Sequence, residues 1–70
     1  MARELHNRIA DNLRQRRAKL KLSQMEVAGR ANIHFTYYSQ IERAVRKDIS
    51  VRILLKITKA MSMGLDEAVG

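Results

Sequence analysis

Residues that could support catalysis or bind a metal are sparse in this sequence and poorly placed for either task. The chain has no cysteine, and its two histidines, His6 and His34, are separated by several expected elements with no carboxylate cluster near either. A zinc site needs three or four such ligands, so we expect no metal. No paired carboxylates, activated nucleophile or glycine-rich phosphate loop is visible. The sequence therefore predicts a protein that is not an enzyme, needs no cofactor and binds no small-molecule ligand.

The charged residues predict a negatively charged partner instead. Fourteen Lys and Arg stand against seven Asp and Glu in 70 residues, which gives a net charge of +7 and a pI near 10.6. Seven of the basic residues lie between Arg3 and Lys21 against two acidic ones, and we expect most of this run to be solvated surface that contributes a general field. A second basic group, at Arg43, Arg46 and Lys47, follows a nearly uncharged polar segment.

The length and composition predict one small domain, residues 1–70, held together by packing alone. A chain of this size buries roughly 60% of its unfolded surface, and without cysteine it has no disulfide to compensate. Its longest apolar runs are three residues, far short of the roughly 20 needed to span a bilayer. The charged N-terminus does not resemble a signal peptide. We expect a cytoplasmic protein that does not enter membranes.

Hydrophobic periodicity predicts an all-α fold. The absence of proline and the abundance of Leu, Ala, Arg, Lys, Glu and Gln favour helix throughout. Helices are expected over about 5–20, 24–31, 35–43 and 50–61, with a final turn or two over 65–69. The helix over 50–61 carries apolar residues over roughly 220° of its circumference, so it needs neighbours on two sides.

Two charged residues fall on the inner faces of their expected helices. Arg17 continues the apolar stripe of the first helix, and Glu42 lies on the core side of the third. Either charge buried alone would cost several kcal/mol, so we infer that the two form an ion pair; the alternative is that both side chains reach the surface.

The segment 23–43 has the pattern of a helix-turn-helix. Ser23 and Glu26 have the spacing of a capping box, which starts a short helix with a small inner face. Asn32 tolerates the left-handed backbone that a tight turn between helices requires. The helix after the turn has one core face and one polar face. In a helix-turn-helix this second helix enters the DNA major groove.

The ordered set of motifs resembles the phage repressor and Cro-like helix-turn-helix family. The matching elements are Asn12-Leu13-Arg14-Gln15-Arg16-Arg17, Leu22-Ser23-Gln24, Val27-Ala28, Asn32-Ile33-His34, Ser39-Gln40-Ile41-Glu42-Arg43 and Leu54-Leu55-Lys56-Ile57. The resemblance covers residues 9–68 and implies a compact five-helix, lambda-repressor-like domain. It departs from the family pattern in the turn glycine, here Asn32, in the glycine after the third helix, here Ala44, and in a loop one residue longer than usual.

The resemblance also implies functional residues for binding double-stranded operator DNA. The principal base-reading positions correspond to Phe35, Thr36 and Gln40. Phosphate or flanking contacts are implied or expected at Gln24, His34, Tyr37, Ser39, Arg43, Arg46 and Lys47. The family further implies the Arg17 and Glu42 ion pair inferred above.

The chemistry of these side chains leaves alternatives open. Gln40 can form a bidentate pair with adenine N6 and N7, or bond other bases less selectively. Thr36 offers a hydroxyl or a methyl group, and Phe35 could contact thymine methyls or fold back on the protein. Tyr38 occupies a core position, whereas Tyr37 lies at the edge, where its hydroxyl could reach a phosphate.

We expect a homodimer, because the apolar arc of the helix over 50–61 exceeds what the core of one small domain needs. The side that carries Ile53, Ile57 and Met61, together with Met63, Leu65 and Val69, is the predicted interface; the alternative is that these residues close the core of the monomer. The favoured function is a sequence-specific transcription regulator of the phage-repressor, restriction-modification controller or autoregulator type. A non-specific cationic binder of nucleic acid or membrane surface, and a protein-interaction adaptor, are the competing hypotheses.

Overall fold

The computed structural model describes residues 4–70 as five helices, with no strand among them. These are α1 (Leu5–Leu20), α2 (Gln24–Ala31), α3 (Phe35–Glu42), α4 (Val51–Ala60) and α5 (Leu65–Val69). The all-α expectation is confirmed, and each predicted helix is found within a residue or so of its expected bounds. Arg3, counted above in the basic run, and the first residues of the expected domain lie outside the described residues.

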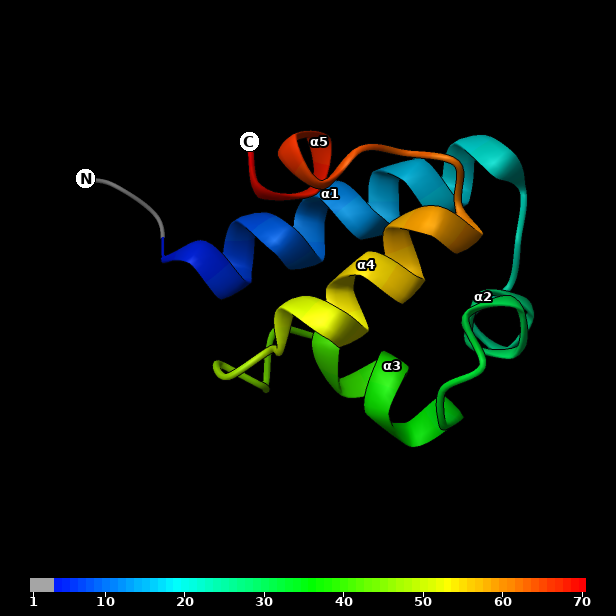
Figure 1. The fold of residues 1–70 in the computed structure, drawn as a ribbon, viewed down its shortest axis with the longest axis horizontal. Helices are drawn as coiled ribbons and strands as arrows, with labels where there is room; N and C mark the ends of the chain where they lie inside the picture. The colour runs from blue at the N-terminus through cyan, green and yellow to red at the C-terminus, as the bar shows by residue number, and fades with distance from the viewer. Residues whose placement is uncertain (1–3) are drawn as a thin grey trace.

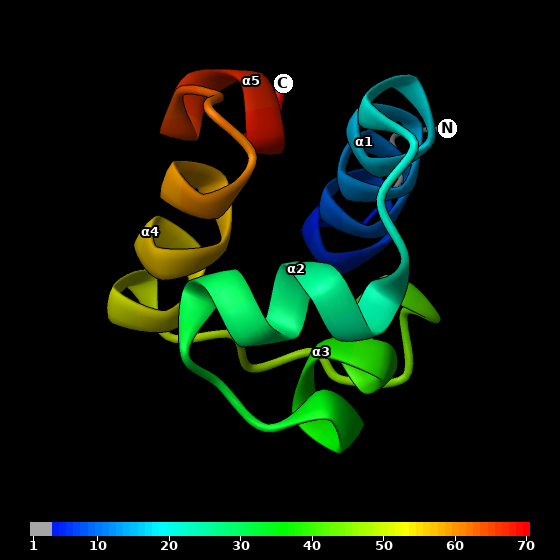
Figure 2. The same cartoon turned by 90° about the vertical axis from the view of Figure 1, so that its right-hand side faces the viewer.

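The helices form a small bundle around one core (Figures 1 and 2). Helix α1 contacts α3 and α5, α2 contacts α3 and α4, and α4 contacts α5. In the side view of Figure 2, α2 runs from the α1 side of the bundle to the α4 side, and α3 lies below it. Helices α2 and α3 therefore occupy one end of the molecule, and α1, α4 and α5 provide the support behind them.

The core is formed by one apolar stripe from each helix. Its most deeply buried large side chains come from α1, α2, α3, α4 and the residue after α4: Leu13, Val27, Tyr38, Ile41, Ile57 and Met61. His6, Glu42 and Thr58 are the buried polar residues among those described. The Thr58 hydroxyl donates to the Leu55 carbonyl, which satisfies it inside α4.

The side of α4 that faces solvent is opposite to the one expected from the sequence. Ile57 and Met61 are 0% exposed and belong to the monomer core, so their assignment to a dimer interface was wrong. Ile53, Met63, Leu65 and Val69 are partly buried and pack against the same core. Val51 and Leu55 are instead 62% and 48% exposed. The apolar surface left over by folding is therefore the Val51 and Leu55 side.

The chain connections around α2 have the chemistry that the sequence predicts. The Ser23 hydroxyl accepts from the Glu26 amide at 3.0 Å, and the Glu26 carboxylate accepts from the Ser23 amide at 2.9 Å. Asn32 adopts φ 56°, ψ 46°, so it makes the left-handed turn between α2 and α3. Ala44 also has a positive φ, 60°, which explains why glycine is the usual residue after the third helix in the family that the sequence resembles.

Candidate nucleic-acid interface

The orientation of α3 is fixed by the buried carboxylate of Glu42, which is only 1% exposed. Arg17 donates to both of its oxygens, through Nε at 2.8 Å and Nη2 at 2.6 Å. Gln24 Nε2 donates to the same carboxylate at 3.0 Å, and Arg17 Nη1 also donates to the Leu22 carbonyl at 3.0 Å. The inferred ion pair is therefore present as a bidentate contact, and it joins α1, α2 and α3 at one point.

Electrostatics at this point favour the charged form of Glu42. Burial by itself would raise the pKa of the carboxyl, but the hydrogen bonds from Arg17 and Gln24, together with the nearby Tyr38 hydroxyl, outweigh it and hold the pKa below its ordinary value. Burial, reinforced by the Glu42 charge, raises the pKa of the Tyr38 phenol. The Tyr38 hydroxyl faces this pair from inside the core, although it makes no hydrogen bond of normal geometry. Glu42 thus stays ionised and anchors α3 at neutral pH.

Two more arginines of α1 bind backbone carbonyls elsewhere in the fold, whereas Arg8, Lys19 and Lys21 of the same basic run are exposed. Arg14 Nη1 donates to the Glu42 carbonyl at 2.6 Å and also pairs with Asp11. Arg16 donates to the Met61 and Ser62 carbonyls, each at 2.9 Å. These carbonyls end α3 and follow α4, where a cation also complements the helix dipole. Part of the +7 charge is therefore engaged inside the protein.

The outer face of α3 carries the predicted base-reading residues. Phe35 is 42% exposed and Thr36 is exposed, whereas Gln40 is half-buried. Arg43 is exposed immediately after the helix, and Lys47 is exposed in the following loop. Ser39 is half-buried beside them. The face is thus polar and nearly uncharged at its centre, with cations at its C-terminal edge.

His34 has a structural role that the sequence reasoning did not foresee. It is the N-cap of α3, and its Nδ1 accepts from the Thr36 amide at 3.2 Å. Because Nδ1 accepts this bond, the neutral ring carries its proton on Nε2, which can donate to a phosphate. The signal lay in the sequence, since a hydrogen-bonding residue directly before a helix is a candidate cap.

Gln24, expected to bind a phosphate, is partly committed inside the protein. One of its two amide N–H groups is used by Glu42, and the second remains for an external acceptor. Gln24 therefore lies at the edge of the α3 face, but its side chain is bound to Glu42, the residue that fixes the orientation of that face.

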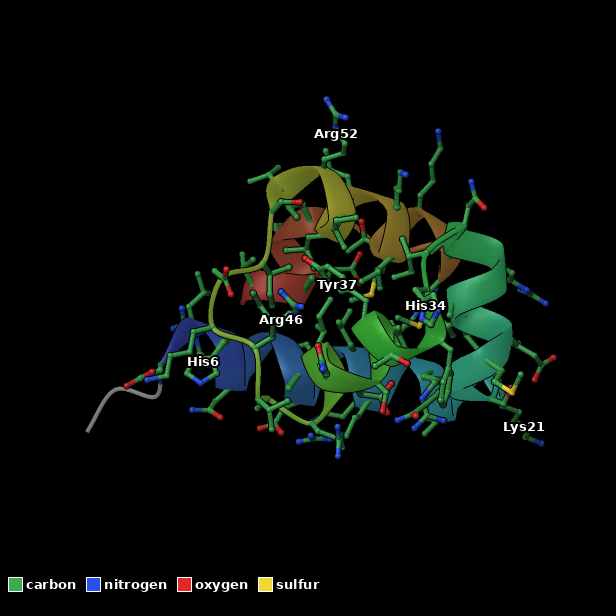
Figure 3. The ribbon with its side chains drawn as sticks, turned by 90° about the horizontal axis from the view of Figure 1, so that it is seen from below. His6, Lys21, His34, Tyr37, Arg46 and Arg52 are labelled. Carbon is green, nitrogen blue, oxygen red and sulfur yellow. The ribbon has the colours of Figure 1, made fainter. Side chains whose placement is uncertain are left out.

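Three expected contact residues form a cluster of their own. The Arg46 Nε donates to Gln40 Oε1 at 3.0 Å, and the Arg46 guanidinium carbon lies 4.3 Å from the centroid of the Tyr37 ring. Figure 3 shows Tyr37 and Arg46 side by side, with His34 at the N-terminal end of α3. The sequence placed Arg46 in a basic loop next to the third helix but did not predict these contacts.

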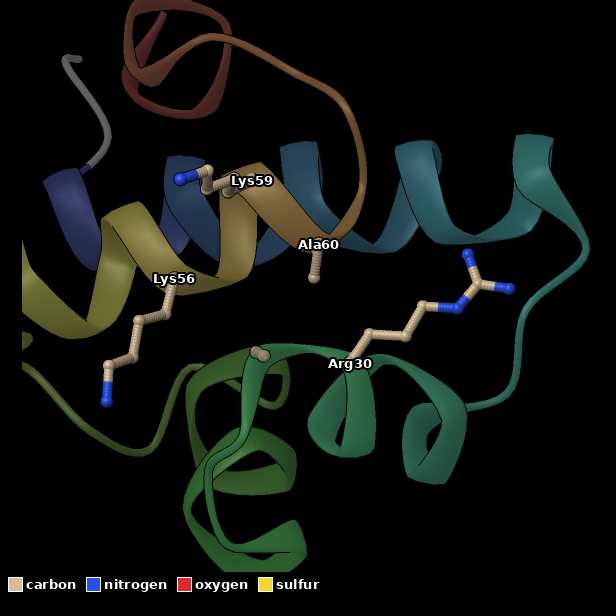
Figure 4. A pocket seen from close by; sticks show the side chains of 5 residues that line it. Arg30, Lys56, Lys59 and Ala60 are labelled. Carbon is tan, nitrogen blue, oxygen red and sulfur yellow. The ribbon is translucent and has the colours of Figure 1, made fainter.

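Away from α3, the described residues also form a hollow lined by cations. This hollow between α2 and α4 is lined by Arg30, Lys56 and Lys59 around an alanine floor, but these side chains diverge and do not converge on one point (Figure 4). Within residues 4–70 no three metal-ligating side chains gather, and no helix is long and apolar enough to cross a membrane.

A capped helix, a left-handed turn and a second helix with an exposed polar face define a helix-turn-helix DNA-binding domain. The Helix-turn-helix family profile matches residues 13–67 of the chain. The chain therefore belongs to this Cro/C1-type helix-turn-helix family of DNA-binding transcription regulators, which are not enzymes.

Solved structures show the same fold. The restriction-modification controller protein C.AhdI from Aeromonas hydrophila superposes with a TM-score of 0.84 at 25% identity, covering 90% of this chain and 94% of that one. The clp gene regulator ClgR from C. glutamicum gives a TM-score of 0.83 at 24% identity, covering 96% of this chain and 91% of that one. A sequence search of curated proteins found no significant match.

Proposed function

We propose that this protein is a sequence-specific regulator that acts in the cytoplasm and binds a two-fold operator as a homodimer. The observation that carries the proposal is the outer face of α3, which is exposed, polar and locked to α1 and α2 through the buried Glu42 carboxylate. A rigid helix with uncharged hydrogen-bonding groups suits base recognition, because phosphate contacts position a protein but do not specify sequence. The similarity to a restriction-modification controller supports the same class of function.

The side chains divide into two sets by charge and position. Gln40, Thr36 and Phe35 are proposed to contact base edges. Phosphates are proposed to be bound by the surrounding residues, which are Gln24, His34, Tyr37, Ser39, Arg43, Arg46 and Lys47. Arg43 and Lys47 are the strongest candidates of this set, since both are exposed and neither forms an ion pair within the described residues.

The proposed dimer is centred on the exposed apolar pair of α4. Val51 and Leu55 are one helical turn apart and so form one patch, and Val45 in the preceding loop is also 63% exposed. The partly buried Ile53, Met63, Leu65 and Val69 are proposed to extend the interface. A two-fold pair would place its recognition helices about 34 Å apart, which matches half-sites one DNA turn apart.

The first test measures how binding to duplex DNA depends on salt. We expect the affinity to fall steeply, with a log–log slope of roughly −0.9 for each phosphate contacted. Lys47→Ala should make the slope shallower by about 1 and weaken binding to all sequences alike. The matched control is Lys19→Ala, because Lys19 is exposed on α1, does not belong to the proposed phosphate-binding set, and should leave the slope unchanged. The readout is a fluorescence anisotropy titration at several salt concentrations.

Two results would favour the competing functions. A flat salt dependence would contradict electrostatic binding to DNA. Equal effects of the two substitutions would point to a non-specific cationic binder of nucleic acid or membrane, whose charge acts without a defined face. Absence of any DNA binding would leave the protein-interaction adaptor, for which exposed Phe35 offers a contact.

A further inference from the structure

The contact between Arg46 and Gln40 constrains how Gln40 can meet a base. Gln40 lies in the recognition helix and Arg46 in the loop that follows it, and the two are joined by the 3.0 Å hydrogen bond from Arg46 Nε to Gln40 Oε1. Both side chains are half-buried, so neither is fully free to reorient in solvent. This pair is therefore a defined arrangement on the binding face itself.

The guanidinium decides which way the Gln40 amide points. Arginine has five N–H donors and no acceptor, so only the oxygen end of the amide can face it. The amide oxygen is consequently directed to Arg46, and the amino group is left for another partner. If the Gln40 amide were inverted, its N–H groups would face the N–H groups of the positively charged Arg46 guanidinium.

Tyr37 keeps Arg46 in place. Its ring lies 4.3 Å from the guanidinium carbon, within the range of a cation–π contact, and its position on α3 is set by the same anchored helix. The Arg46 guanidinium is thus held between the Tyr37 ring and the Gln40 oxygen. Figure 3 shows the Tyr37 and Arg46 side chains next to each other.

We propose that Arg46, held on the Tyr37 ring, is a positioning residue that sets the base preference of Gln40 to guanine rather than adenine. This inference rests on the proposed function of α3. The bidentate pair with adenine uses the glutamine oxygen to accept from N6 and the amino group to donate to N7. Arg46 takes one of the two acceptor positions of that oxygen and places a positive charge where the partly positive adenine amino group would have to approach. Guanine offers two acceptors, O6 and N7, which suit the free amino group and the nearby cation.

The experiment is in-vitro selection of bound duplexes from a randomised pool at fixed salt, followed by affinity measurements on guanine and adenine versions of the selected site. The parent should prefer guanine at one position in each half-site, by about fivefold to 150-fold. Gln40→Ala should lose preference at that position alone. Arg46→Ala should keep the other positions and shift this one toward adenine. Thermal melts of each variant confirm folding.

The Tyr37 variants separate the ring from its hydroxyl. Tyr37→Phe keeps the ring and should keep the guanine preference, even if a phosphate contact is lost. Tyr37→Leu removes the ring and should shift the preference in the same direction as Arg46→Ala. A loss of affinity that is uniform across sequences would not produce this pattern.

Three outcomes would overturn the inference. An adenine preference in the parent would contradict the proposed role of Arg46 directly. An Arg46→Ala variant that binds more weakly but selects the same base would show that Arg46 is only a phosphate contact, while the proposed function stands. A parent that selects no sequence at all would contradict the proposed function of the protein, and with it the proposed role of Arg46.

Discussion

Replacing Glu42 with alanine is expected to lower the free energy of unfolding by about 3–5 kcal/mol, which for a domain of this size is most of its stability. The loss of stability arises because the partners of the Glu42 carboxylate remain buried without it. Arg17 would keep a half-buried guanidinium without its carboxylate, and Gln24 would lose its acceptor. Thermal and urea unfolding followed by circular dichroism measures the effect.

Two control variants distinguish the anchoring role of Glu42 from the general effect of removing a carboxylate. Glu26→Ala removes only the exposed capping box and should cost about 1 kcal/mol. The double substitution of Arg17→Met with Glu42→Leu removes both charges and should recover most of the loss, because an apolar replacement of a buried ion pair is often neutral. A Glu42→Ala melt that matches the parent would refute the anchoring role.

The same carboxylate gives the stability a defined acid dependence. The folded-state pKa of Glu42 lies below the value of an unfolded glutamate, so its contribution is fully present above the ordinary glutamate pKa. It is lost as the pH falls below that value and through the lower folded-state pKa. Parent stability should therefore fall in acid, and the Glu42→Ala variant should show a flatter profile over the same range.

Ile57→Ala is expected to destabilise the monomer by about 2–5 kcal/mol, while Leu55→Glu should leave monomer stability nearly unchanged. The two residues are two positions apart on α4, but Ile57 is 0% exposed and Leu55 is 48% exposed. Leu55→Glu should instead weaken self-association, because it places a charge in the centre of the proposed patch. Unfolding curves and sedimentation velocity report the two effects separately.

A charge change elsewhere on α4 provides the control for self-association. Lys59→Glu alters the charge on the same exposed side without removing apolar area, so sedimentation should change less than with Leu55→Glu. A Leu55→Glu variant that associates like the parent would rule out the Val51 and Leu55 patch as the interface. A parent that is monomeric at high micromolar concentration, with and without DNA, would rule out the dimer.

Local chemistry made much of this fold predictable. The capping box at Ser23 and the turn at Asn32 follow from the properties of single residues, and both appear as expected. The Arg17 and Glu42 pair could be inferred because a buried charge has few tolerable arrangements, and helical spacing placed both on inner faces.

The side of α4 could not be predicted, and the reason is physical. Its apolar residues span most of the circumference, so the periodicity does not indicate which part faces the core. That choice depends on where α1, α2 and α5 pack. The contacts of Arg16 could not be predicted either, because the carbonyls that it binds, those of Met61 and Ser62, lie far along the chain. The Arg46 and Tyr37 contact likewise depends on the path of the eight-residue loop from Arg43 to Ser50 between α3 and α4, which spacing alone does not fix.

The most direct test of the central claim, that α3 reads DNA sequence, is a competition between two duplexes for the parent protein. One duplex carries the site obtained by selection, and the other carries the same base composition in shuffled order, at one physiological salt concentration. We predict that the selected duplex competes about a thousandfold or more better, as expected for specific recognition. Equal competition by the two duplexes would contradict the account.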